Sequence, residues 1–501
     1  MKKKSQASYL TRRNFLGRSA CSTMALTGMV DTLAHLKLMQ SSLAQGGGGS
    51  DYKALVVLFL FGGNDSNNTL IPRIGHPEYD NYKAGRGVLG VLDDADPDYV
   101  QFDPASIALT GTADPYGVHP SMQPVADLFT NQQLSFVSNV GTLAFPITRA
   151  DFLDSNKSHL LPPQLFSHSD QQVQWQSSLS DQPFRTGWGG RAADLLLGSG
   201  HQSSSVSLSV SLAGINSLQV GDSTSQYAVT SNGAIPLSGY GTDYVNAIDG
   251  SGGYLNTDNG RRLKAFDDIN GMVHDHLLED GYNKIVKNSR DNETVIGGAI
   301  AASNETAIDG AFTTANATSS TADQLKMIAK LISGRSALGN NRQIFFCSMG
   351  GFDTHAEQVG GHGGLMNDLA TSLSGFNSAM QAVGENDNVM LMTHSDFTRT
   401  LTPNGTSSNT AGSDHGWGGH QIVMGGPVDG GKIFGTFPQL LVNAGDDAGT
   451  SRGRWIPSTS VDQYAAVGGN WLGVSDLSHV FPNLGRFDDP LSVSSNVNYV
   501  T

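Results

Sequence analysis

Cysteine, basic residues and long apolar runs are scarce in this 501-residue sequence, and each scarcity narrows the possible classes of protein. Lysine and arginine total 30 against 45 acidic residues, which gives a formal charge of −15. That charge argues against nucleic acid as a partner, because binding to phosphate backbones needs a basic surface. Charged residues make up only 15% of the chain, which excludes a highly charged disordered polymer.

The two cysteines are Cys21 and Cys347. Since Cys21 falls in a predicted leader, the mature chain would hold one thiol and no internal disulfide. Cys347 lies inside an apolar run, and free cysteine is among the most buried residue types. We therefore expect a core residue at this position rather than a nucleophile.

The first 45 residues have the features of an export leader. Lysines at positions 2–4 precede Thr11–Gly17 (TRRNFLG) and a weakly apolar stretch over residues 20–36. Paired arginines before Asn-Phe-Leu resemble the twin-arginine signal, and a basic amphipathic helix is the alternative. The stretch is too short and polar for a firm membrane span, so no stable span is expected in the mature chain.

These features predict a signal peptide over residues 1–45 and a glycine-rich linker over residues 46–53. They also predict the twin-arginine export machinery as a partner, and a periplasmic or secreted protein. The remaining residues, 54–501, are long enough to bury a large core.

Three short apolar runs in this remainder are each followed closely by an acidic residue. Runs of this length bounded by glycine or polar residues predict buried strands, and ligands of α/β proteins bind beyond the carboxyl ends of parallel strands. The three pairs are Ala54–Phe61 with Asp65, Ile344–Cys347 with Asp353 and His355, and Asn388–Thr393 with Asp396. Together they predict one shared site.

Helical and strand-like segments alternate along the chain, which is typical of a mostly parallel sheet with helices on its faces. Periodic apolar residues predict helices over Met122–Thr130, Ala322–Ile332 and Leu365–Val383, and one long helix over Arg261–Lys287. Little regular structure is expected over Arg73–Tyr116. Residues 200–260 are rich in glycine and serine and include the alternating Ser205–Leu212, so we expect an inserted β-rich subdomain there.

The densest group of histidine and aspartate lies in Ser413–His420 (SDHGWGGH). With the strand ends it provides seven candidate metal ligands: Asp65, Asp353, His355, Asp396, Asp414, His415 and His420. Mixed carboxylate and imidazole ligands suit zinc, manganese or iron, and one or two such divalent ions would lower the pKa of a bound water or hydroxyl. The alternative is that each lone aspartate caps a turn and that His415 binds a backbone carbonyl.

Seven segments of the chain resemble a bacterial family called domain of unknown function 1501. They follow the family order between Ala54 and Leu441: LVVLFLFGGNDSNNTLIP, PPQLFSHSDQQVQWQ, TGWGGRAADLL, FFCSMGGFDTH, SDFTRT, DHGWGGHQIVMGG and GGKIFGTFP. That family is placed with the sulfatase-like and alkaline-phosphatase-like hydrolases. The resemblance implies a three-layer α/β domain with a two-metal site at the carboxyl edge of its sheet.

The resemblance also implies roles for the metal-binding residues. Asp65 matches the carboxylate after the first strand, Asp353 and His355 match a later Asp/His pair, Asp396 matches the Asp of an Asp-His step, and His415 or His420 matches the last histidine. Phe397 stands where related enzymes have the histidine of that step. Either one metal is lost, or Asp414 and His415 bind it instead.

Ser167 is the nucleophile candidate, because related enzymes place theirs at the N-terminus of a helix, where the helix dipole favours an anion. Arg399 or His168 would hold the oxygens of that anion through charge-assisted hydrogen bonds. The sequence therefore favours an exported metal-dependent hydrolase of a phosphate or sulfate ester, with a small or polymeric substrate.

A second hypothesis is a non-catalytic exported binding or surface-assembly protein that keeps the same fold. Phe397 and the short spacing between Asp353 and His355 favour it, whereas the number of candidate ligands does not. A metal-free hydrolase built on Cys347, or on a Ser/His/Asp set, is a third hypothesis.

Overall fold

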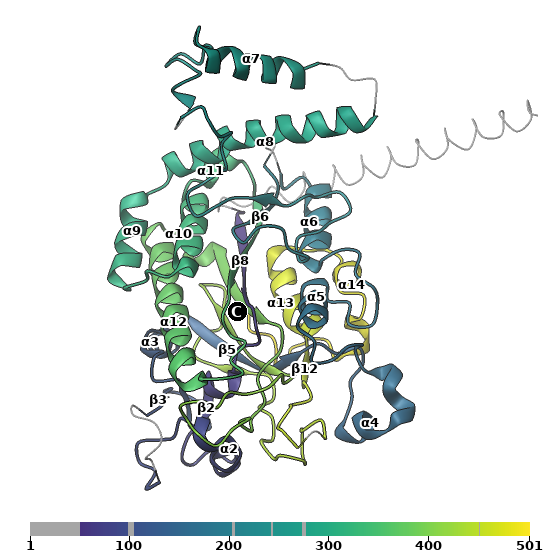
Figure 1. Cartoon of the computed structure of the whole chain (residues 1–501). Coiled ribbons are helices and arrows are strands. Elements are labelled where there is room, and N and C mark those ends of the chain that lie inside the picture. The colour runs from purple at the N-terminus through teal and green to yellow at the C-terminus, as the bar shows by residue number, and fades with distance from the viewer. Residues whose placement is uncertain (1–50, 99–104, 203–205, 242–243, 273–276, 450) are drawn as a thin grey trace, which may run out of the picture.

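A mixed β-sheet runs through the centre of the molecule, as the computed structural model shows for residues 51–98, 105–202, 206–241, 244–272, 277–449 and 451–501 (Figure 1). Its nine described strands have the order β11-β5-β10-β9-β1-β8-β6-β7, with β12 beside β5. They are β1 (Lys53–Leu60), β5 (Leu134–Gly141), β6 (Ser209–Ser211), β7 (Tyr227–Ala228), β8 (Arg342–Met349), β9 (Val389–Ser395), β10 (Gly419–Met424), β11 (Ile433–Phe434) and β12 (Thr459–Ser460). Only β10 among these is antiparallel to its neighbours, β5 and β9, so the prediction of a mostly parallel sheet is confirmed.

The three strands predicted to carry the site lie side by side at the centre of this sheet. β1 is parallel to β8 on one side and to β9 on the other, and Leu60 at its end is level with Met349 and Ser395. The segments after the three strands therefore leave the same edge of the sheet together.

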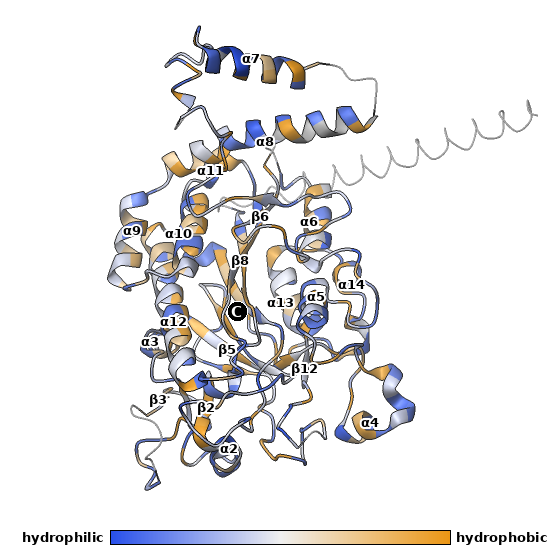
Figure 2. Cartoon of the chain, in the orientation of Figure 1, coloured by the Kyte–Doolittle hydropathy of each residue, from blue (hydrophilic) through white to orange (hydrophobic). Residues whose placement is uncertain are grey.

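Helices cover both faces of the sheet. Side chains of a strand point alternately to the two faces, so the apolar residues of a fully buried strand make both faces apolar. Val56 and Leu58 of β1 belong to one hydrophobic cluster, whereas Val57 and Phe59 belong to the other. The first cluster packs against α3 (Gln123–Thr130), α9 (Glu305–Thr314), α10 (Ser320–Ser333) and α12 (Gln358–Ala382), and the second against α5 (His168–Ser177), α6 (Trp188–Gly198) and α13 (Val461–Leu472) (Figure 1). Figure 2 shows the hydrophobic strands between these two helical layers.

Other elements lie around this three-layer core. A small antiparallel sheet has the order β2-β4-β3, and α7 and α8 extend beyond one end of the molecule (Figure 1). These elements are β2 (Leu70–Pro72), β3 (Ile107–Ala108), β4 (Tyr116–Val118), α2 (Tyr79–Arg86), α4 (Arg149–Leu153), α7 (Asp258–Asn270), α8 (Leu277–Ala302), α11 (Arg335–Leu338) and α14 (Leu477–Val480).

Two local predictions differ from the structure, and one predicted strand is confirmed. Residues 73–116, expected to be irregular, contain α2 and part of the small sheet. The long helix expected over Arg261–Lys287 is interrupted, because α7 ends at Asn270 and is capped by Gly271, a residue with low helix propensity. The alternating Ser205–Leu212 segment contains a strand, as predicted: β6 lies in the central sheet and pairs with β8.

Cys347 is buried in β8, as its apolar surroundings predicted. None of the helices in the described ranges combines the length and apolar character that a membrane crossing needs. The predicted signal peptide and most of the linker lie outside the described residues.

Candidate metal centre

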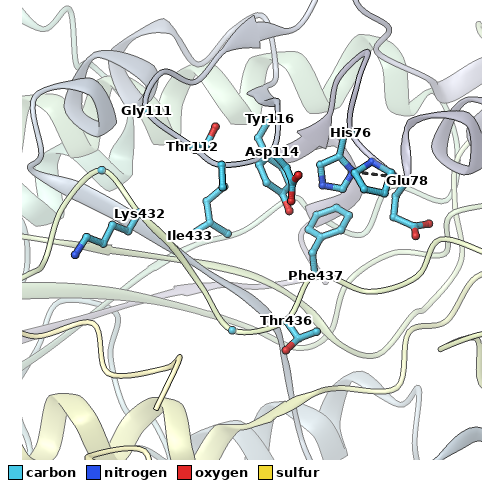
Figure 3. Close-up of a pocket in the computed structure, with 14 residues that line it drawn as sticks. His76, Glu78, Gly111, Thr112, Asp114, Tyr116, Lys432, Ile433, Thr436 and Phe437 are labelled. Atoms are coloured by element: carbon cyan, nitrogen blue, oxygen red, sulfur yellow. Dashed lines mark hydrogen bonds between the residues drawn. The ribbon is translucent and has the colours of Figure 1, made fainter. Parts of the chain in front are cut away.

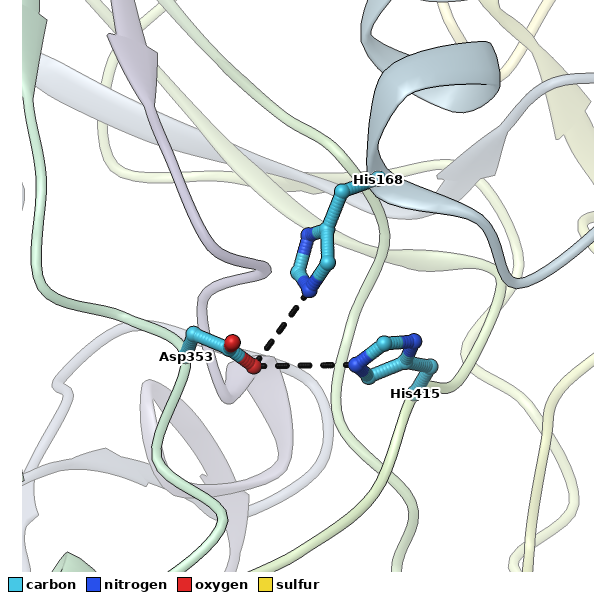
Figure 4. Close-up of side chains that lie close together, drawn as sticks. All are labelled: His168, Asp353 and His415. Atoms are coloured by element: carbon cyan, nitrogen blue, oxygen red, sulfur yellow. Dashed lines mark ion pairs between the residues drawn. The ribbon is translucent and has the colours of Figure 1, made fainter.

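Three histidines and one aspartate meet beyond the carboxyl ends of β1, β8 and β9, and we call them the His/Asp cluster: His168, His355, His415 and Asp353. Oδ1 of Asp353 lies 3.4 Å from Nε2 of His168, 3.1 Å from Nε2 of His355 and 3.6 Å from Nε2 of His415. The Nε2 atoms of His355 and His415 are 2.9 Å apart. Figure 4 shows His168 and His415 reaching Asp353 from different segments.

A close approach of backbones brings Asp353 to this position. Gly62, just after β1, has a φ of +109°, and a Cβ atom there would lie 2.4 Å from the backbone nitrogen of Asp353. Glycine is therefore required at this point, because it has no Cβ and adopts positive φ readily.

The second nitrogen of each ring in the cluster faces an acceptor. Nδ1 lies 2.6 Å from Oδ2 of Asp396 in His168, 3.3 Å from Oδ1 of Asp414 in His355, and 2.7 Å from the carbonyl oxygen of Phe166 in His415. An acceptor at Nδ1 selects the tautomer with the proton on that atom. A neutral ring then directs the lone pair of Nε2 at Asp353, and histidines that bind metals are held in this way.

Four electron-rich atoms that converge in this manner repel one another unless a cation or protons lie between them. Nε2 of His168 is buried and has no hydrogen-bond partner among the described residues. The Asp353 carboxylate lies 3.4 Å from this atom. His168, Asp353 and His415 can each offer one ligand atom to a common metal ion.

The protonation states of Asp353 and His415 suit a metal ion. Partial burial alone would raise the pKa of Asp353, but the hydrogen bond and charge of Arg399, together with His168 and His355, hold that pKa below its ordinary value. Burial lowers the pKa of His415. An ionised carboxylate and a neutral imidazole are the forms that bind metals.

Asp396 and Asp414 lie behind the cluster rather than within it. The side chain of Asp396 is fully buried and accepts hydrogen bonds from Nε2 of Gln172 (2.8 Å) and from the backbone of Gly62 (3.3 Å), besides its contact with His168. Asp414 holds His355 and forms an ion pair with Arg452 (2.6 Å). Both carboxylates thus orient histidines of the cluster.

Asp65 is engaged by Arg86 of α2, and both side chains are fully buried. Gln358 donates a further hydrogen bond to Asp65. The guanidinium of Arg86 also donates to the carbonyl oxygens of Thr400 (3.0 Å) and Leu401 (2.9 Å). Arg86 and Gln358 therefore engage Asp65 in the interior, and Asp65 does not join the His/Asp cluster.

Replacing Arg86 by methionine is expected to destabilise the protein by ~3–5 kcal/mol, because it leaves the Asp65 carboxylate buried without an opposite charge. Chemical denaturation of wild type and Arg86→Met measures this change. The double variant Asp65→Leu/Arg86→Met removes both charges and should recover most of the loss. An Arg86→Met protein within ~1 kcal/mol of wild type would contradict this account of the pair.

His420 does not join the cluster. Its ring stacks on Phe437 with centroids 4.9 Å apart, and its Nδ1 lies 3.3 Å from the backbone nitrogen of Asn139. Phe437 also lines a separate pocket of about 590 Å³, together with His76, Tyr116 and Lys432, which shares no lining residue with the cluster (Figure 3).

The predicted catalytic residues are arranged around His168. Ser167 immediately precedes α5, and its hydroxyl donates to Oδ2 of Asp170 at 2.6 Å. His168 is the first residue of that helix and belongs to the cluster itself. The side chain of Arg399 is fully buried, and its Nη1 donates to Asp353 (2.8 Å) and to the carbonyl oxygen of Gly62 (3.2 Å). Arg399 therefore fixes Asp353.

Phe397 packs beside the cluster, with its ring stacked on His415 (4.7 Å between centroids) and close to His168 (4.8 Å). Three supporting groups were not predicted from the sequence: the side chains of Arg86 and Gln172 and the backbone of Phe166. Gln172 follows His168 by four residues in a helix, a spacing that places both on one face and is a usable signal. The sequence contains no comparable signal for Arg86.

The fold and the cluster define a mixed α/β protein with a candidate His/Asp metal centre. The chain belongs to the family described as "Protein of unknown function (DUF1501)", whose model matches residues 52–452. Among curated proteins the sequence has no significant match.

Two solved structures show a distant likeness. "Crystal structure of Ps i-CgsB in complex with k-i-k-neocarrahexaose" shares 7% identity over 88% of this chain and 77% of that chain, with a TM-score of 0.31. "Crystal structure of Ps i-CgsB" shares 8% identity over the same fractions, with a TM-score of 0.29. Likeness at this level supports no conclusion about this protein.

Proposed function

We propose that this protein is an exported metal-dependent hydrolase of a phosphate or sulfate ester, built on an alkaline-phosphatase-like domain. The observation that carries the proposal is the His/Asp cluster, in which three Nε2 atoms meet one carboxylate oxygen while all three Nδ1 atoms face acceptors. The clustered histidines and carboxylate favour zinc, manganese or iron as the ion.

The chain's own residues divide into ligands and supports. A divalent ion bound there would polarise an ester oxygen and lower the pKa of a bound water. His168, His355, His415 and Asp353 would hold it. Asp396, Asp414 and the carbonyl of Phe166 fix the rings, and Phe397 keeps water from one side of them.

Ser167 is the proposed nucleophile. It lies next to His168 at the start of α5, and its hydroxyl is hydrogen-bonded to the Asp170 carboxylate, which is placed to accept its proton. A nucleophile and base within hydrogen-bond distance are the arrangement that nucleophilic catalysis requires. Export is proposed to follow the twin-arginine route into the periplasm or the medium.

The second candidate is a non-catalytic exported binding or surface-assembly protein. Two observations favour it: Phe397 occupies the side of the cluster between His168 and His415, and Asp65 is neutralised by Arg86. Both reduce the number of ligands available to the pair of metal ions that catalysis would need.

Elemental analysis combined with an ester assay tests the proposal. Purified protein, offered zinc, manganese and iron in turn, is expected to hold at least one ion per chain and to hydrolyse a generic aryl phosphate or aryl sulfate. Chelation should stop turnover, and one of the three metals should restore it. Absence of any bound metal would refute the hydrolase mechanism. Stoichiometric metal without hydrolysis of either ester would favour the binding protein.

A further inference from the structure

Arg454 contacts the His/Asp cluster through its Nε and not through the two terminal nitrogens of its guanidinium. Its Nε donates to the carbonyl oxygen of His415 at 2.6 Å, and its guanidinium carbon lies 4.3 Å from the ring centroid of Phe166. The carbonyl of Phe166 in turn faces Nδ1 of His415 at 2.7 Å. Arg454, Phe166 and His415 therefore form one closed unit that fixes the guanidinium beside a candidate metal ligand.

The two terminal nitrogens of Arg454 have no hydrogen-bond or ion-pair partner in the part of the chain that the structure describes. Arg452 contributes a second guanidinium nearby, although its Nη2 is already bound to Asp414 at 2.6 Å. Arg399 is not available for a ligand, because it is fully buried and engaged with Asp353 and with backbone carbonyls.

A guanidinium presents its N–H groups as a planar fork that matches two oxygens of a tetrahedral oxyanion. Stacking on an aromatic ring and a hydrogen bond at Nε keep this fork in one orientation, which reduces the entropy lost when an anion binds. We propose that Arg454 is the residue that binds the non-bridging oxygens of the phosphate or sulfate group at this centre. The proposal rests on the proposed hydrolase function and names the anion-binding residue of the same site.

Arg486 provides a matched control. Its guanidinium also lies 4.3 Å from a phenylalanine ring, that of Phe145, and it also donates to a backbone carbonyl, that of Ala144, at 2.9 Å. Unlike the terminal nitrogens of Arg454, Nη1 of Arg486 is already bound to a carboxylate, that of Asp181 at 2.7 Å. Substituting Arg486 therefore removes an equivalent stacking contact with phenylalanine, but it does not remove a guanidinium that is free to bind an anion.

The test is isothermal titration of inorganic phosphate and of inorganic sulfate into wild type, Arg454→Met, Arg454→Lys and Arg486→Met. Metal content, ester turnover and thermal stability are measured on each sample. Arg454→Met should weaken binding of the preferred anion by about 10- to 100-fold, because charge-assisted hydrogen bonds are lost. Arg454→Lys keeps the charge without the fork, so we expect an intermediate loss. Arg486→Met should stay within about 2-fold of wild type.

The outcomes separate this inference from the proposed function. Unchanged anion affinity in folded Arg454→Met or Arg454→Lys, with metal and turnover present, would overturn the inference alone. No anion binding by metal-loaded wild type would also overturn it. If the protein holds no metal but the Arg454 variants still bind the anion more weakly than wild type, the anion site is supported and the hydrolase proposal fails. The anion that binds more tightly indicates the class of ester.

Discussion

Asp353→Asn is expected to empty the metal centre and to reduce ester hydrolysis to background. Asp353 supplies the negative charge that faces the three Nε2 atoms of the cluster, with distances of 3.1–3.6 Å. Asparagine keeps the shape of the side chain and an oxygen for Arg399, but it removes that charge. The side chain is 49% exposed, so we expect stability to change little. Elemental analysis and the aryl ester assay measure the two losses.

The loss of metal in Asp353→Asn is compared with the loss in two further variants. Asp396→Asn alters the acceptor behind His168 and should weaken metal affinity by about 10- to 100-fold, the usual effect of changing an outer partner. The loss from Asp353→Asn should be larger than this. His159→Ala removes an exposed imidazole and should leave metal content unchanged. A metal-replete Asp353→Asn protein would contradict the assignment of Asp353 as a ligand.

The edge of the sheet that holds the cluster was predictable from the sequence. Apolar runs bounded by glycine or polar residues identify β1, β8 and β9, and parallel strands bring the segments after them to one edge. Asp353, His355 and Asp396 follow directly from that rule. His415 was found because histidine and aspartate are concentrated around it.

The division of these residues into candidate ligands and supporting residues was not predictable, because it depends on contacts between distant segments. Asp396 and His168 are 228 positions apart in the chain, and only the packing of α5 on β9 brings them together. Asp65 has the same sequence context as Asp353, yet Arg86 of α2 neutralises it. A strand-end pattern locates a carboxylate but does not show which partner reaches it.

Acid is expected to destabilise this protein strongly, starting near pH 6.5. Burial lowers the pKa most in four deeply buried histidines: to about 3 for His394 and His420, to about 4 for His119, and well below the ordinary value for His362. Below pH 6.5 the unfolded chain binds protons at these positions and the folded chain does not. Stability is therefore full above pH 6.5 and falls as the pH drops toward the folded pKa values, by up to ~1.4 kcal/mol per histidine per pH unit.

Asp462 acts in the opposite direction and offsets part of this loss. Burial raises the pKa of Asp462 to about 7, so the folded state keeps a proton that the unfolded state releases above its ordinary pKa. Its contribution to stability therefore grows as the pH falls from about 7 toward 4. One carboxyl group against four histidines leaves a net loss in acid.

His394→Phe isolates one of these histidines. The ring of His394 is surrounded by Phe59, Trp175, Trp188 and Tyr464, and neither of its nitrogens has a hydrogen-bond partner among the described residues. Phenylalanine suits these aromatic surroundings and takes up no proton. The difference in unfolding free energy between pH 7.5 and pH 4.5, measured by denaturant titration, should be ~2–3 kcal/mol smaller than in wild type.

Replacement of the exposed His479 by phenylalanine is the matched control, and it should leave the acid loss unchanged because that ring is not buried. Equal acid losses in wild type and His394→Phe would show that His394 is protonated in the folded state, which its surroundings oppose. Loss of metal in acid acts on wild type and on both variants alike. The difference between the two variants therefore measures the contribution of the buried His394 ring to the acid loss of stability. A buried imidazole that has neither water nor a partner for its charge stays neutral in the folded state, whereas an exposed one takes up a proton in both states.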